Sequence, residues 1–170
     1  MLIVLSGLPG TGKSAIAEGL AKALAIPVLS VDPIESAVIR AGLARGFETG
    51  YAAYLVAEAV ADATLKLGLG CVIDAANYVE AGRDLWRGLA ARSGSPMKVI
   101  VCTLPDEDTH RARLSDRDRD LARGEPTWDD VETQRAEWIP WAEQHLILDT
   151  TRPIEANLAE ALSYVRSPSK

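Results

Sequence analysis

The stretch Gly7-Leu8-Pro9-Gly10-Thr11-Gly12-Lys13-Ser14 follows the pattern G-x-x-x-x-G-K-[ST] without deviation. The apolar run Leu2-Ile3-Val4-Leu5 precedes it and has the length and branching of a buried strand. After it, apolar residues recur at helical spacing between Ile16 and Leu24. A strand, a glycine-rich loop and a helix in this order predict a loop that cradles a phosphate group.

The residue types of this loop suit that chemistry. Gly7, Gly10 and Gly12 allow tight turns of positive φ and a close approach of the backbone to an anion. Successive N–H groups then form a concave nest, and the following helix adds the positive end of its dipole. We expect Lys13 to reach the β- and γ-phosphates of a nucleotide and Ser14 to offer its hydroxyl to Mg²⁺. The predicted nucleotide-binding residues of the loop are Gly7, Pro9, Gly10, Thr11, Gly12, Lys13 and Ser14.

Length and composition predict a soluble globular chain. Its 170 residues suggest one domain with a real hydrophobic core, here placed at 1–166, followed by a tail at 167–170. The net charge of −6 disfavours binding to a long nucleic acid, although a local basic groove stays open. The chain start lacks the features of a signal peptide and no stretch reaches the length of a membrane span, so a cytoplasmic location is expected.

Isolated cysteines and histidines give no sign of a metal site. Cys71 and Cys102 each lie within an apolar, strand-like run, which favours two buried thiols over a disulfide or a metal pair. His110 and His145 are each isolated and are predicted to be surface residues or residues satisfied by internal hydrogen bonds.

Apolar runs and helical patterns alternate along the rest of the chain. This alternation predicts an α/β fold of three layers with a mainly parallel sheet. Phe47–Gly50 is predicted to be a loop, and Thr127 to cap the helix that follows it. The later strands are expected at 28–31, 71–74, 98–104 and 146–149, and the later helices at about 34–44, 51–67, 80–92, 105–114, 128–138 and 154–165.

Two aspartates are placed at the carboxyl ends of predicted strands, the edge where such sheets bind ligands. Asp74 ends an apolar strand, as a second Mg²⁺-directed carboxylate would, or else it caps a loop or helix. The next residue is Ala75 rather than the glutamate of many dedicated ATPases. Asp32 follows the second strand and is the best candidate general base; its alternative is to cap the next helix, and the two roles are compatible.

Arginines cluster between residues 111 and 123, interleaved with Asp116, Asp118 and Asp120. They suit a lid at about 113–126 that clamps the charge of a transferring phosphoryl group. Arg113 and Arg117 are four residues apart and share a helical face. The alternative is a solvated surface held together by Asp–Arg pairs. The arginines are Arg111, Arg113, Arg117, Arg119 and Arg123.

Candidate contacts for a phosphate acceptor are fewer. Arg40 lies beyond Asp32 on the predicted helix, where it either reaches the acceptor or is a surface arginine. Tyr51 and Tyr54 follow the predicted loop and are placed at an acceptor pocket, together with Asn77. The tryptophans are all predicted to lie on helices and to serve packing; they are Trp86, Trp128, Trp138 and Trp141.

These features together resemble the small P-loop kinases, the group that includes chloramphenicol phosphotransferase, gluconate and shikimate kinases, the polynucleotide-kinase-like domain and zeta toxins. The resemblance rests on the P-loop, the aspartate that closes strand two, the segment 72–77 and the pattern Arg113-Leu114-x-x-Arg117, and it covers nearly the whole chain. It implies a sheet in the order 2-3-1-4-5, with ATP and Mg²⁺ as cofactors.

The resemblance also assigns roles to residues. It implies that Asp32 is the base or the residue that orients the acceptor, that arginines near Arg117 close on the phosphates, and that Thr151 and Arg152 lie near adenine. It sets the strands of the two cysteines on either side of the first strand, too far apart for a disulfide. The leading hypothesis is a kinase of a small hydroxyl compound, whether metabolite, nucleoside or antibiotic. The alternatives are a polynucleotide 5′-kinase and an ATP-binding switch that transfers nothing.

Overall fold

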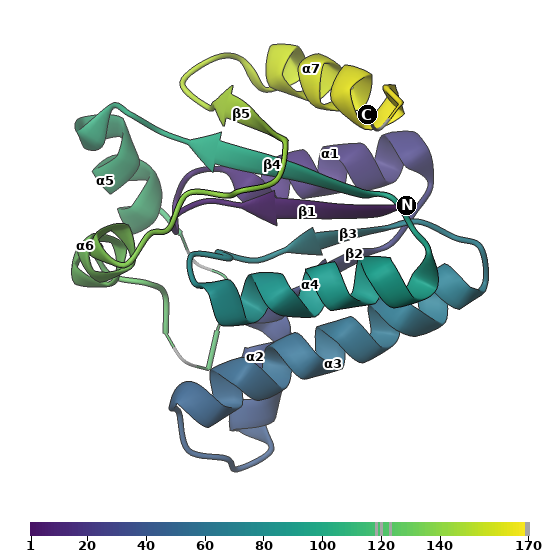
Figure 1. The fold of residues 1–170 in the computed structure, drawn as a ribbon. Helices are drawn as coiled ribbons and strands as arrows, with labels where there is room; N and C mark the ends of the chain where they lie inside the picture. The colour runs from purple at the N-terminus through teal and green to yellow at the C-terminus, as the bar shows by residue number, and fades with distance from the viewer. Residues whose placement is uncertain (118, 120, 123, 169–170) are drawn as a thin grey trace.

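The computed structural model describes residues 1–117, 119, 121–122 and 124–168. A single parallel sheet runs through the described chain, with its strands in the order β2-β3-β1-β4-β5 (Figure 1). The predicted order is therefore confirmed. The strands are β1 (Leu2–Ser6), β2 (Val28–Ser30), β3 (Cys71–Asp74), β4 (Met97–Thr103) and β5 (His145–Asp149).

Helices cover both faces of this sheet (Figure 1). α1 and α7 pack together over one face, and α3 and α4 pack over the other, with α2 against α3. α5 and α6 lie beyond the carboxyl ends of the strands (Figure 1). The helices are α1 (Lys13–Leu24), α2 (Val31–Arg40), α3 (Phe47–Lys66), α4 (Glu80–Ser93), α5 (Glu107–Ser115), α6 (Trp128–Ala136) and α7 (Ile154–Arg166). Among the described residues, no helix is both long enough and apolar enough to cross a membrane.

Strand β1 contributes side chains to two hydrophobic clusters, one on each face of the sheet. Leu2 and Val4 belong to the cluster under α3 and α4, whereas Ile3 and Leu5 belong to the cluster under α1 and α7. Successive side chains of a strand point to opposite faces, so a strand buried on both faces must be apolar throughout. All of these side chains are fully buried. This burial fixes the carboxyl end of β1, from which the glycine-rich loop departs.

Strand β2 is shorter than predicted, because the chain turns into α2 at Val31. Asp32 therefore lies in the first turn of α2, and the residue before the helix is Ser30. The prediction that Asp32 caps this helix is wrong. Pro33 is tolerated beside it because the first N–H groups of a helix have no partner within the helix.

The predicted loop at Phe47–Gly50 is also wrong, since α3 begins at Phe47. The Thr49 hydroxyl accepts a hydrogen bond from the N–H of Gly46 at 3.0 Å and donates to its carbonyl at 2.9 Å. In the structure Thr49 is buried and holds the first turn of the helix together.

Helix α6 ends at Ala136, two residues earlier than predicted. Pro140 lacks the N–H that a helix needs, and it disfavours helical backbone at the residue before it. Trp138 and Trp141 therefore lie outside the helices, contrary to prediction. Trp141 still has a packing role, because it is buried in the core and donates from Nε1 to the Ser6 hydroxyl at 2.9 Å.

Asn77 ties the ends of two neighbouring strands to α4. Its side-chain nitrogen donates to the Leu5 carbonyl at 2.7 Å, and its side-chain oxygen accepts from Trp86 Nε1 at 2.8 Å. Its own carbonyl accepts from Arg83 Nε at 2.7 Å. The residue is buried and has positive φ, at 52°. This position gives Asn77 a structural role at the edge of the sheet that holds the glycine-rich loop.

We expect Asn77→Ala to lower the free energy of unfolding by about 2–4 kcal/mol, because it leaves the Leu5 carbonyl and the Trp86 N–H buried without partners. Thr64→Ala is the control, since it removes an exposed side-chain hydrogen bond to Val60 and should change stability little. Urea unfolding followed by circular dichroism measures both. Equal stability of the two variants would contradict the role given to Asn77.

Candidate active site

The glycine-rich loop has the backbone that its sequence predicts. Gly12 precedes α1 with a left-handed conformation, φ 82°. Gly7 has φ 145°, and a Cβ added there would lie 2.3 Å from the Cys102 carbonyl oxygen. Only glycine fits this position without displacing β4. The Lys13 ammonium donates to the Leu8 carbonyl at 2.9 Å, so the side chain folds back over the loop.

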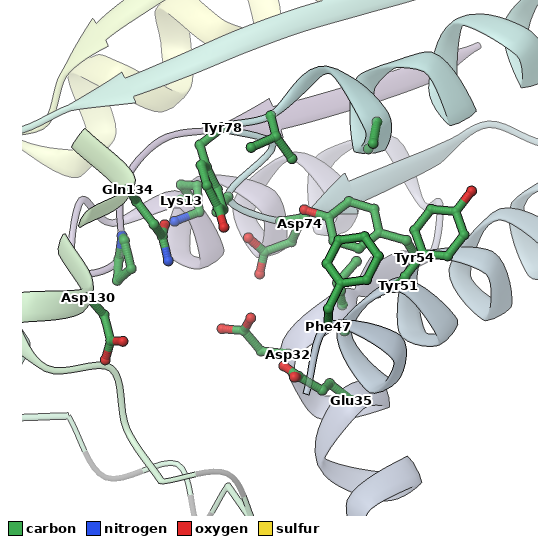
Figure 2. A pocket seen from close by; sticks show the side chains of 18 of the residues that line it. Lys13, Asp32, Glu35, Phe47, Tyr51, Tyr54, Asp74, Tyr78, Asp130 and Gln134 are labelled. Atoms are coloured by element: carbon green, nitrogen blue, oxygen red, sulfur yellow. The ribbon is translucent and has the colours of Figure 1, made fainter. Parts of the chain in front are cut away.

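Two carboxylates act on the charge of Lys13. Removal from water lowers the pKa of the Lys13 ammonium, and Asp74 and Asp32 oppose this shift. All three side chains line one cleft, together with Ser14 and Arg117. Figure 2 shows Lys13, Asp74 and Asp32 around the same open space. The structure therefore brings together the P-loop lysine and the two predicted carboxylates.

The cleft has a volume of about 380 Å³ and is lined by residues that end or follow β1, β2 and β3, at the carboxyl edge of the sheet. Residues from the glycine-rich loop, α2, α3, α6, the loop after β3 and the lid contribute to it. Of the predicted site residues, those that line it are Pro9, Lys13, Ser14, Asp32, Tyr51, Tyr54, Asp74 and Arg117.

Other predicted residues lie elsewhere. Arg40 donates to the Ser36 hydroxyl at 2.9 Å, and Arg152 forms an ion pair with Glu160 at 2.7 Å. The Thr151 hydroxyl donates to Asp149 at 2.7 Å. These residues do not line the cleft, and neither does Asn77. Of the residues predicted to contact the acceptor, Arg40 and Asn77 therefore lie outside the cleft, whereas Thr151 and Arg152 were predicted to lie near adenine.

Arg113 lies beside the glycine-rich loop rather than in the cleft. Its guanidinium donates to the Thr150 carbonyl at 3.0 Å, and a Cβ added to Gly12 would lie 3.8 Å from Arg113 Nη1 and from the Thr150 side chain. The loop at 150–152 and the end of α5 are thus joined next to the start of α1. The resemblance to the small P-loop kinases implies that the adenine of the nucleotide lies near this loop.

The oxygen donors in the cleft fit Mg²⁺. Ser14 supplies a hydroxyl and Asp74 a carboxylate, which accepts a hydrogen bond from the Ser30 hydroxyl at 2.8 Å. Within the described ranges, no group of three or more His, Cys, Asp or Glu could hold a metal ion. Such sparse protein ligation suits Mg²⁺, which usually keeps waters and binds through one or two carboxylates and substrate phosphates.

The lid is joined to Asp32 by an arginine whose partner the sequence did not identify. Arg119 Nη1 donates to Asp32 at 2.9 Å, and Arg119 also pairs with Glu125 at 3.0 Å. Arg117 lines the cleft; burial lowers the pKa of its guanidinium, and neighbouring Arg119 adds to that shift. The N–H of Ala122 donates to the Ser36 hydroxyl at 2.7 Å, so the lid rests on α2. Predictions for Asp118, Asp120 and Arg123 lie outside the described residues.

His110 supports the glycine-rich loop from behind. It is buried rather than on the surface, and its Nε2 lies 2.6 Å from the Pro9 carbonyl oxygen. Its ring packs edge-on against Trp128, with ring centroids 5.2 Å apart. Burial lowers the pKa of the imidazole. No local pattern marks this residue in the sequence, because its partners come from two distant segments.

The P-loop, the sheet order and the carboxylates at the carboxyl edge define the P-loop class of nucleoside-triphosphate-binding proteins. A protein-family model described as an AAA domain matches residues 2–151. The match spans most of the chain, and the chain belongs to this family of P-loop proteins. A search of curated proteins gave no match.

Solved structures give the same fold. A sugar kinase from Janibacter sp. has a TM-score of 0.73 and 21% identity, with 96% of this chain and 93% of that chain covered. The APS kinase CysC of Mycobacterium tuberculosis, in complex with AMPPNP and APS, has a TM-score of 0.70 and 20% identity, with 98% and 97% covered. Kti12 of Chaetomium thermophilum, in complex with ADP-AlF3, has a TM-score of 0.70 and 17% identity, with 98% and 100% covered. The resemblance to small P-loop kinases is thereby confirmed for family and fold.

The burial of His110 predicts a pH dependence of stability. The folded protein holds the imidazole neutral below its ordinary pKa, whereas the unfolded chain takes up the proton. Stability from this residue is therefore complete above about pH 6.5 and is lost as the pH falls toward the lowered folded-state pKa.

We expect His110→Gln and His110→Leu to reduce the slope of unfolding free energy against pH between pH 6.5 and 5, by up to about 1.4 kcal/mol per pH unit. Gln keeps a donor for the Pro9 carbonyl and Leu does not, so the pair separates loss of the hydrogen bond from loss of the titrating group. Denaturant unfolding at a series of pH values measures the slope. Slopes equal to that of the parent protein would exclude His110 as its source.

Proposed function

We propose that this protein is an ATP-dependent phosphotransferase that moves the γ-phosphoryl group to a hydroxyl group of a small molecule. The observation that carries this proposal is one cleft that contains both the P-loop lysine and a carboxylate from a different element, Asp32 of α2. A nucleotide-binding protein without an acceptor does not need the second carboxylate. A kinase needs it to orient the attacking hydroxyl or to take its proton.

The phosphate side of the cleft is built from positive charge and N–H groups. The N–H groups of the glycine-rich loop and the Lys13 ammonium would hold the β- and γ-phosphates. Arg117 would stabilise the charge that spreads over the transferring phosphoryl oxygens. Ser14 and Asp74 would hold Mg²⁺, which neutralises phosphate charge when it is bound.

The acceptor side depends on Asp32. At neutral pH an aspartate is ordinarily ionised and can accept a proton or a hydrogen bond from a hydroxyl. Arg119 pairs with one carboxylate oxygen, Oδ2. Asp32 would thus be held in place by the lid while it orients the hydroxyl.

The size of the cleft supports a small acceptor. Its volume of about 380 Å³ falls within the range of small-molecule pockets, roughly 300–1,000 Å³. The similar solved structures include proteins named as a sugar kinase and an APS kinase. Ala75 lies beside Asp74 in the cleft and cannot activate a water molecule. These observations favour transfer to an acceptor over dedicated hydrolysis.

We expect Asp32→Asn to lower the kcat of acceptor-dependent ADP release by about 100-fold or more, with ATP binding retained, because the amide cannot take the hydroxyl proton. Lys13→Ala should instead weaken ATP binding. Asp84→Asn, an exposed aspartate on α4, is the matched control and should leave both quantities unchanged. The measurement is ADP release from Mg·ATP with a panel of hydroxyl compounds and a 5′-hydroxyl oligonucleotide.

Other outcomes of this experiment would support one of the two alternative functions instead. Stimulation by the oligonucleotide alone would identify a polynucleotide kinase. ATP binding without stimulation by any acceptor would contradict the small-molecule proposal and favour a nucleotide-dependent switch.

A lid arginine and an arginine of α5 predict a second contrast. Arg117→Ala should lower kcat by about 100-fold, since the guanidinium lines the cleft where phosphoryl charge develops. Arg111→Ala should leave kcat unchanged, because Arg111 pairs with Glu107 on the exposed side of α5 and stacks on Trp128. Steady-state kinetics at saturating ATP compare the two. Equal effects would show that the lid contributes only general positive charge.

A further inference from the structure

Three aromatic residues form a stripe along the first two turns of α3. Phe47, Tyr51 and Tyr54 are four and three residues apart, so their side chains share one face of the helix. All three line the cleft, and Figure 2 shows their rings gathered on one side of it. We call these three residues the aromatic stripe.

Packing of the core does not account for the outer part of this stripe. The residues that α3 buries are small or lie further along, such as Ala53, Ala57 and Ala61. Phe47 is 76% exposed and Tyr51 is 37% exposed. Their rings are nonetheless stacked, with planes 6° apart and centroids 6.0 Å apart. Exposed apolar surface of this kind, at the rim of a cleft, marks a binding site.

The inner ring of the stripe is held in a fixed position. Tyr54 packs on Gly82 of α4 so closely that a Cβ at Gly82 would lie 2.8 Å from the Tyr54 ring. The Tyr54 hydroxyl accepts a hydrogen bond from the Asn77 N–H at 3.3 Å, and burial raises its pKa. The ring also lies 5.8 Å from that of Trp86. The cleft therefore has a rigid aromatic floor that leads outward to the exposed pair.

A second carboxylate of α2 lies beside Asp32 and below the aromatic stripe in Figure 2. Glu35 is one helical turn after Asp32 on α2, and both line the cleft. A Cβ added to Gly50 of α3 would lie 3.6 Å from Glu35 Oε1. In Figure 2, Glu35 lies below Phe47 and beside Asp32. Donor groups on an acceptor that covers the stripe would meet this carboxylate.

We infer that the acceptor is an alcohol that carries a flat ring and hydrogen-bond donors. Its ring would stack on the aromatic stripe, a donor group would bond to Glu35, and its hydroxyl would reach Asp32. This inference rests on the proposed function. The hydroxyl oxygen would form a bond to the γ-phosphorus while the bond to the bridging oxygen of ADP breaks, and the hydroxyl proton would pass to Asp32.

The test is direct binding of chosen alcohols to the protein saturated with Mg·ADP, measured by isothermal titration calorimetry. The flat-ring probes are thymidine and 2-amino-1-phenylethanol, and the probes without a flat ring are glucose and gluconate. We expect at least one flat-ring probe to bind more tightly than either of the others. Binding of glucose or gluconate alone, or no binding by a flat-ring probe, would overturn the inference.

Two substitutions test whether the flat-ring probe binds at the aromatic stripe. Phe47→Ala should weaken binding of the flat-ring probe by about 3- to 10-fold, because a stacking partner is lost. Leu67→Ala is the matched control, since Leu67 is 77% exposed at the other end of α3 and does not line the cleft. It should leave probe binding unchanged, and both variants should bind Mg·ADP like the parent protein. An equal affinity of Phe47→Ala and the parent for the probe would overturn the inference.

Turnover of the same compounds with Mg·ATP distinguishes the two proposals. Phe47-dependent binding of a flat-ring alcohol without acceptor-dependent ADP release would leave the ligand class standing and contradict the kinase function. ADP release stimulated by glucose or gluconate, with no binding of the flat-ring probes, would support the kinase function and overturn the flat-ring acceptor.

Discussion

The close approach of Gly7 to β4 is the constraint on which the site depends. β1 lies between β3 and β4, so the chain that leaves it must pass between the ends of both neighbours. The Gly7 N–H donates to the Ala76 carbonyl at 3.1 Å, while the Cys102 carbonyl occupies the space where a side chain would start. Ser6 adds a bond from its hydroxyl to Ala76 at 3.0 Å. Ala76 follows β3, and Asp74 is the last residue of that strand. These hydrogen bonds therefore fix the phosphate loop relative to Asp74.

Two parts of the protein on opposite sides of the cleft, the segment around Arg83 and the lid, are held by different kinds of interaction. Behind one wall, the fully buried Arg83 donates to the Asn77 and Pro140 carbonyls and lies 4.5 Å from the Trp141 ring. Loss of such a buried group would leave several carbonyls without partners. The lid instead is held by ion pairs that are partly exposed, such as that of Arg119 with Asp32. Pairs of this kind contribute little to stability and weaken with salt. Among the described residues, the ion pairs of the lid are therefore more sensitive to salt than the buried contacts of Arg83.

Local patterns predicted the parallel sheet and the glycine-rich loop, since each depends on residues close together in the sequence. The order of the strands came instead from the resemblance to the small P-loop kinases, and the structure confirms it. The end of β2 was predicted one residue late, because Val31 continues the apolar run although it begins α2. The start of α3 was missed because Thr49 acts through the backbone groups of Gly46, which no apolar pattern reveals. Asn77 was predicted to be at the acceptor, because sequence places it at the correct edge of the sheet but does not show which way its side chain points. The contacts of His110 and Arg119 join distant segments, and only the fold brings them together.

The two cysteines lie in β3 and β4, on either side of β1, and neither is accessible. Burial raises the pKa of the Cys71 thiol to about 11 and that of the Cys102 thiol to about 12. Thiolate is the species that reacts with maleimides and other electrophiles, so both sulfur atoms are protected by solvent exclusion and by protonation. A cysteine introduced on the lid or on α3 would then be the single reactive thiol of the folded protein. Spectroscopic labels can therefore be attached at chosen positions without first replacing the native residues.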